Sequence, residues 1–151
     1  MKTTFLYIIA ILSLLSFFNP LFPQHNNLQQ NFNSTNKVKI QSIILDELES
    51  GIVNNQMQTI SKYFSSQPYI SLINGVNGYY SSNQAYYILE DFFNSYKVVS
   101  FRFEEKNTEG SLSYGKGEYY FEKKGKREVA HLYITLSKAG SKWYITQISI
   151  N

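Results

Sequence analysis

The chain has 151 residues, of which 43% are hydrophobic and 17% charged, as is typical of one globular domain. An excess of 14 basic over 11 acidic residues is too small to indicate a nucleic-acid partner. The absence of cysteine excludes disulfides, thiolate metal sites, a cysteine nucleophile and a lipid-carrying cysteine.

The N-terminus carries the features of an export signal. Lys2 precedes an apolar run from Phe5 to Phe18, which matches the apolar region of a signal peptide and is shorter than the ~20 residues of a spanning helix. No small-residue cleavage pattern follows. Residues 1–23 are therefore predicted to be a signal peptide or an uncleaved anchor, the only part expected to contact a membrane. The protein is expected to be exported, and periplasmic or associated with the cell envelope.

A linker and two helices are predicted next. Residues 24–37 are rich in Asn and Gln, which indicates a disordered linker before a domain over residues 38–151. An amphipathic helix is predicted next. Its apolar face consists of Ile40, Ile44, Leu48, Gly51 and Ile52, and its polar face of Ser42, Asp46 and Glu49. A shorter helix is predicted from the spacing of Met57, Ile60 and Phe64.

A strand and a third helix come after Pro68. The stretch YISLING predicts a short strand, and Asn77-Gly78 predicts a tight turn. Ser81 and Gln84 satisfy the capping-box pattern at the start of a helix. The apolar face of this helix comprises Ala85, Ile88, Leu89, Phe92 and Tyr96.

The pattern changes to period two after Lys97. Val99, Phe101 and Phe103 alternate with polar residues, and three further strands follow, with turns at 124–126 and 139–141. The segment GSLSYGKG lacks the hydroxyl residue that a phosphate-binding loop needs after its lysine, so its glycines are expected to relieve crowding in a strand. Helices followed by antiparallel strands predict an α+β fold.

Three stretches carry a resemblance to a known family: LESGIVNNQMQTISKYFSSQPYISLING, YYSSNQAYYILEDFF and SKWYITQISI. Together with the order of elements over 38–151, they resemble the nuclear transport factor 2-like superfamily, which includes SnoaL-like cyclases and ketosteroid isomerases. In detail they are similar to the bacterial exported family called domain of unknown function 4783. The resemblance implies a cone-like fold, with a curved antiparallel sheet of about four to five strands packed against N-terminal helices.

The resemblance implies an acidic general base near YISLING in isomerases and cyclases. This chain has no Asp or Glu between Gly51 and Leu89, so the base is missing and no catalytic residue is predicted. His131 is the only histidine of the expected domain, which predicts no metal site, and no cofactor is expected. The alternative is a small hydrolase or isomerase that uses Glu47 or His131.

The expected function is therefore non-enzymatic binding of a small apolar ligand, a peptide or a partner protein, in the cone cavity or on the sheet. Exposed tyrosines, with Tyr86, Tyr87, Tyr133 and Tyr144 as candidates, would supply an aromatic surface, for instance for a homodimer through the outer sheet face. Large aromatic residues would either fill the core or contact the ligand. The predicted ligand-binding residues are Phe64, Phe92, Phe101, Phe103, Tyr119 and Trp143.

Overall fold

The computed structural model describes the backbone of residues 27–151 and the side chains of residues 40–151. The predicted signal peptide and the first residues of the predicted linker lie outside this range. Helix α2 (Asn27–Val53) begins within the predicted linker, because extending an existing helix costs far less free energy than nucleating one. No helix in the described range is long and apolar enough to cross a membrane.

Residues 33–151 form one unit built on a sheet of six strands. In chain order the strands are β1 (Phe64–Leu72), β2 (Asn77–Tyr79), β3 (Lys97–Asn107), β4 (Leu112–Lys123), β5 (Lys126–Ala139) and β6 (Lys142–Ile150). Their spatial order is β2-β1-β6-β5-β4-β3. The predicted α+β class is confirmed, although the sheet has more strands than expected and is mixed, because β1 and β6 pair in parallel.

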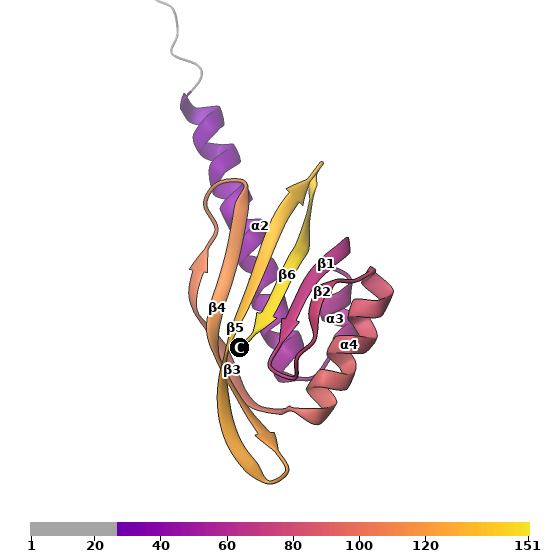
Figure 1. Ribbon diagram of the computed structural model, residues 1–151. Helices are drawn as coiled ribbons and strands as arrows, with labels where there is room; N and C mark the ends of the chain where they lie inside the picture. The colour runs from indigo at the N-terminus through magenta and orange to yellow at the C-terminus, as the bar shows by residue number, and fades with distance from the viewer. Residues whose placement is uncertain (1–26) are drawn as a thin grey trace, which may run out of the picture. The chain divides into compact units, whose positions relative to one another are not determined.

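The helices contribute to a single hydrophobic core on one face of the sheet (Figure 1). Helix α3 (Met57–Ser61) precedes β1, and helix α4 (Ser82–Ser95) connects β2 to β3. Alternate residues of each strand point into this core, as Leu132 and Ile134 of β5 do. The face with the core is called the inner face below, and the opposite one the outer face.

The tight turn lies earlier than predicted. The Gly75 amide donates a hydrogen bond to the Leu72 carbonyl at 3.0 Å, and Gly75 adopts φ +95°, which glycine reaches without steric cost. Asn77 and Gly78, the predicted turn residues, are instead part of β2, where Gly78 is in register with Ile70. The prediction at Asn77-Gly78 was wrong because Gly75 closes the turn and leaves β2 free to pair with β1.

Strand β1 begins before Pro68, at Phe64, so the second predicted helix is shorter than expected. The pairing of β1 with β6 shifts register between Phe64 and Tyr69. Pro68 falls within this irregular interval, where its missing N–H interrupts no regular ladder. Its carbonyl accepts a hydrogen bond from the Tyr80 amide at 3.1 Å, which helps to hold the chain before α4.

The predicted capping box is present at the start of α4. The Gln84 amide donates to Ser81 Oγ at 3.3 Å, and the Ser81 amide donates to Gln84 Oε1 at 3.0 Å. The helix buries Ala85, Leu89, Phe92 and Phe93, so its apolar face is close to the prediction.

Strand β3 breaks the predicted alternation at its start. Phe101 and Phe103 are buried as predicted, whereas Val99 is 43% exposed. A register shift between Val98 and Ser100 inserts one extra residue opposite β4. Such a bulge reverses the side-chain alternation, so Val98 faces the core instead of Val99.

The glycines of the predicted crowded strand allow β3 and β4 to pack closely. A Cβ atom at Gly117 would lie 2.0 Å from the Arg102 carbonyl oxygen, and one at Gly115 would lie 2.7 Å from the Phe103 ring. Both glycines are buried within β4. The expected role in relieving crowding is therefore confirmed, and β-strand rather than a helix follows the GKG sequence.

Polar side chains attach α2 to β3. The Phe103 amide donates to Glu49 Oε2 at 2.9 Å, and Lys106 Nζ donates to Asp46 Oδ1 at 2.6 Å. The predicted polar face of this helix is thus a contact with β3, at the second register shift of that strand. Ile40, expected on the buried face, is 52% exposed and lies near the middle of α2.

Candidate functional site

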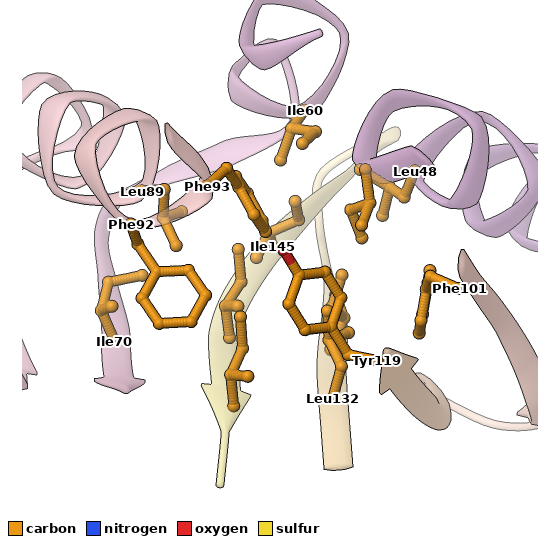
Figure 2. Close-up of a cluster of buried hydrophobic side chains, with 14 of the residues drawn as sticks. Leu48, Ile60, Ile70, Leu89, Phe92, Phe93, Phe101, Tyr119, Leu132 and Ile145 are labelled. Carbon is orange, nitrogen blue, oxygen red and sulfur yellow. The ribbon is translucent and has the colours of Figure 1, made fainter. Parts of the chain in front are cut away.

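The six predicted ligand-binding aromatics are all buried in the core: Phe64, Phe92, Phe101, Phe103, Tyr119 and Trp143. Phe92 and Tyr119 have no exposed surface, and Figure 2 shows Tyr119 among side chains from α2, α4 and the sheet. The Tyr119 hydroxyl donates to the Tyr96 carbonyl at 2.6 Å, and burial raises the pKa of Tyr119. It is therefore a neutral donor with its partner already supplied by the protein.

Two of the six, Phe101 and Trp143, also border hollows at the surface. The hollow at Phe101 lies beside charged residues of β3 and β4, including Arg102, Glu104 and Glu118. Trp143 borders a more apolar one. Contact of all six residues with a ligand stays a prediction.

The hollow at Trp143, called the α2–β6 groove, has a volume of about 300 Å³. One side is formed by α2 and the other by the start of β6, with residues from the α3–β1 connection between them. Its complete lining is Ile40, Ile44, Lys62, Tyr63, Ser141, Lys142, Trp143 and Tyr144. The groove therefore combines aliphatic and aromatic surface with two lysines.

Glu47 lies beside this groove and is held by two of its lining residues. Lys62 Nζ donates to Glu47 Oε2 at 2.5 Å, and Tyr63 Oη donates to the same oxygen at 2.8 Å. These two hydrogen bonds lower the pKa of Glu47, and the one from Lys62 has the larger effect. The pKa of Tyr63 is raised, mainly by burial. A carboxylate stabilised in its ionised form is a weaker proton acceptor, which disfavours Glu47 as a general base.

The two lysines of the groove differ in their partners. Lys62 is neutralised by Glu47. Lys142 is exposed and has no ion-pair or hydrogen-bond partner for its side chain among residues 40–151. The groove and its rim consequently carry one uncompensated positive charge.

His131 lies on the outer face of β5, in register with Glu118 of β4. Its side chain is exposed, and it borders a hollow with Glu104, Lys116 and Tyr133. The structure therefore separates the two residues, since His131 borders a hollow of the outer face and Glu47 lies beside the α2–β6 groove. No group of three or more potential metal-ligating side chains occurs in the described part of the chain.

A second large hollow, called the tyrosine trough, lies on the outer face and has a volume of about 580 Å³. It is lined by Gln67, Tyr69, Tyr79, Leu112, Tyr133, Thr135, Thr146 and Gln147. Of the four tyrosines predicted to form an aromatic surface, Tyr133 belongs to the trough and Tyr144 to the groove, whereas Tyr86 and Tyr87 lie on α4.

Sequence reasoning missed most of the trough. Tyr69 alternates with the buried Ile70 in β1, and that alternation was a usable signal. The trough itself could not be read from local patterns, because Tyr79, Gln147 and Thr135 meet only through strand pairing. The expectation of a turn at Asn77-Gly78 also removed β2 from the predicted sheet.

Solved structures share this fold. A DUF4783 family protein from Bacteroides uniformis ATCC 8492 has a TM-score of 0.64 and 17% identity, over 70% of this chain and 94% of that one. A DUF4783 family protein from Bacteroides ovatus ATCC 8483 has a TM-score of 0.60 and 18% identity, over 69% of this chain and 90% of that one. An NTF-2 like protein of unknown function from Shewanella oneidensis MR-1 has a TM-score of 0.52 and 13% identity, over 72% of this chain and 93% of that one.

These similarities identify the fold as nuclear transport factor 2-like, as the sequence resemblance implied. Residues 45–151 match the family described as Domain of unknown function (DUF4783). The chain belongs to this family. A search of the curated proteins found no match. Because one superfold hosts many unrelated functions, the residues of the sites rather than the fold determine what the protein does.

Proposed function

We propose that the protein is an exported, non-enzymatic binding domain that holds a small amphipathic anion in the α2–β6 groove. The observation that carries this proposal is the position of Lys142, an unpaired cation at the edge of an aromatic and aliphatic groove. The signal-like residues 1–23 support export.

The groove suits a ligand with an apolar body and a negatively charged end. The exposed Ile40 offers most of the apolar contact surface, to which the largely buried Ile44 and Trp143 add only their edges. Burying this surface against a ligand is favourable in proportion to the area removed from water. A carboxylate at Lys142 would form a charge-assisted hydrogen bond. The volume of about 300 Å³ lies at the lower end of the usual range for ligand pockets, which favours a small ligand.

The Glu47–Lys62–Tyr63 cluster supports binding better than catalysis. Its hydrogen bonds fix Lys62 and Tyr63 against α2 and leave Glu47 a weakened base. The acid that a cyclase or isomerase would need on β1 is replaced by uncharged residues throughout that strand. The cluster thus shapes the rim of the groove and balances the charge of Lys62.

Intrinsic fluorescence provides a direct test, because Trp143 is the only tryptophan in the chain. The full chain is titrated with decanoate and, as the uncharged comparison, with decanol. We expect a saturable change in Trp143 emission with decanoate and binding of decanol that is at least about tenfold weaker. Absence of a saturable change with decanoate, or equal affinity for the two, contradicts the proposal.

Two matched variants locate the anion. Lys142→Gln removes the groove cation and is expected to weaken decanoate binding about tenfold. Lys124→Gln removes an exposed lysine at the β4–β5 hairpin and should leave binding unchanged. Equal losses in both variants would indicate general charge attraction rather than a site at Lys142.

A further inference from the structure

We propose that the tyrosine trough on the outer face is a second binding site, whose ligand is a neutral oligosaccharide. The site is separate from the α2–β6 groove and does not depend on its function. Three observations carry the inference: exposed aromatic walls, a polar base with unused hydrogen-bonding groups, and a lining without charge.

One row of side chains crosses the outer face from β2 to β4. Tyr79 is in register with Tyr69, Tyr69 with Gln147, Gln147 with Thr135, and Thr135 with Tyr114. Because neighbouring strands lie about 4.8 Å apart, the row extends for nearly 20 Å. The trough follows this row from Tyr79 to Thr135 and therefore crosses the strands, a shape that fits a chain of sugar rings.

Aromatic pairs form the two sides of the trough. Tyr79 is 74% exposed and packs edge-to-face on Tyr69, with ring centroids 5.1 Å apart. Tyr133 packs against Tyr114 with centroids 5.4 Å apart on the other side. Rigid tyrosines offer contact area at low cost in conformational entropy, and the apolar C–H face of a pyranose ring can stack on them.

The base and rim offer hydrogen-bonding groups that the protein itself does not use. The side-chain amides of Gln67 and Gln147 and the hydroxyls of Tyr79 and Tyr133 make no hydrogen bond to the rest of residues 40–151. A carboxamide supplies both donors and acceptors, and a phenol does the same. Sugar hydroxyls also act in both directions, so these groups are complementary to a polyhydroxylated ligand.

Charge favours a neutral sugar over an anionic one. The lining contains no Asp, Glu, Lys, Arg or His. The nearest charges in the adjacent row are Lys116 and Glu105, whose atoms Nζ and Oε2 lie 2.8 Å apart, so they largely neutralise each other. An anionic glycan would find no uncompensated cation in the trough.

A second copy of the chain is a poorer occupant. A two-fold axis through the trough would place each hollow opposite the same hollow of the partner. Such an interface would leave the space between the copies unfilled, whereas stable interfaces pack at their centre as densely as protein interiors.

The experiment titrates the full chain with maltohexaose, cellohexaose, xylohexaose and mannohexaose, followed by isothermal calorimetry and amide NMR shifts. We expect at least one to bind with a Kd of about 1 mM or tighter. Tyr79→Ala and Gln147→Ala should each weaken this binding about tenfold or more. The matched control Tyr87→Ala removes another exposed tyrosine, on α4, and should leave binding unchanged.

Several results would overturn the proposal. One is the absence of binding by all four sugars, and another is binding that Tyr79→Ala and Gln147→Ala do not affect. A third is tighter binding of an oligogalacturonate, which would show that charge is recognised. The fourth is a dimer, measured by light scattering, that dissociates in Tyr79→Ala, because a copy of the chain would then occupy the face.

Discussion

The inner and outer faces of the sheet use the same aromatic residues in opposite ways. On the inner face, Tyr119 has no exposed surface and its hydroxyl is bound to the Tyr96 carbonyl. On the outer face, the rings of Tyr79 and Tyr133 pack only against neighbouring tyrosine rings in the aromatic pairs described above, and their hydroxyls make no hydrogen bond within residues 40–151. The difference shows that the buried Tyr119 finds a hydroxyl partner within the protein, whereas Tyr79 and Tyr133 leave their hydroxyls free for the ligand that we propose.

The largest effect should come from removing an inner aromatic. Phe92→Ala deletes a fully buried ring that stacks on Tyr96 at 4.4 Å between centroids. The cavity and lost transfer free energy should reduce the free energy of unfolding by about 3–5 kcal/mol. Tyr87→Ala, on the exposed side of the same helix, should change it by no more than about 0.5 kcal/mol. Urea unfolding measures both, and similar losses would contradict the division between the faces.

The next effect concerns the close contact of β3 with β4. Gly117→Ala would place a Cβ atom 2.0 Å from the Arg102 carbonyl oxygen, a backbone atom that can move only with its strand. We expect a loss of about 1–3 kcal/mol or more. Lys116→Ala, at the neighbouring outer position, should cost much less, because it removes only an exposed ion pair. Thermal unfolding compares the two, and equal melting temperatures would refute the crowding.

A pair of hydroxyl deletions tests the comparison directly. Tyr119→Phe leaves the buried Tyr96 carbonyl without this donor and should destabilise the fold by about 1–2 kcal/mol. Tyr133→Phe should change stability by less than about 0.5 kcal/mol, since its hydroxyl has no partner in the described chain. Chemical denaturation of both variants provides the measurement. A larger loss for Tyr133→Phe would mean that the outer tyrosines are structural.

The smallest effect lies at the rim of the groove and depends on pH. The hydrogen bonds from Lys62 and Tyr63 lower the pKa of Glu47 from its ordinary value of 4.5. The ionised carboxylate therefore contributes stability above that pH, and the contribution is lost as the pH falls through the lowered pKa.

Because Glu47 and Lys62 are 40% and 49% exposed, the contribution should be about 0.5 kcal/mol or less. Glu47→Gln should be less stable than wild type at about pH 7, and the difference should disappear as the pH falls through the lowered pKa of Glu47. The exposed Glu104→Gln serves as the control. A difference between wild type and Glu47→Gln that is unchanged at low pH would mean that ionisation is not its source.

Local sequence patterns predicted the elements that depend on neighbours in the chain. The capping box at Ser81 and Gln84 predicted α4, and the period-two pattern after Lys97 with its turn signals predicted strands β3 to β6. They did so because capping and burial periodicity are set within a few residues. The family resemblance predicted how these elements combine into a fold, although it did not predict which strands pair with one another.

The sequence by itself determined the class of fold, the inner apolar face and the absence of an acid on β1. Only the tertiary structure decided which residues share a site, because Lys142 meets Ile44, and Tyr79 meets Gln147, across long separations in the chain. The bulge at Val98–Ser100 and the early turn at Gly75 likewise depend on pairing with distant strands. Strand register is a non-local property, and a shift of one residue exchanges the two faces of the sheet.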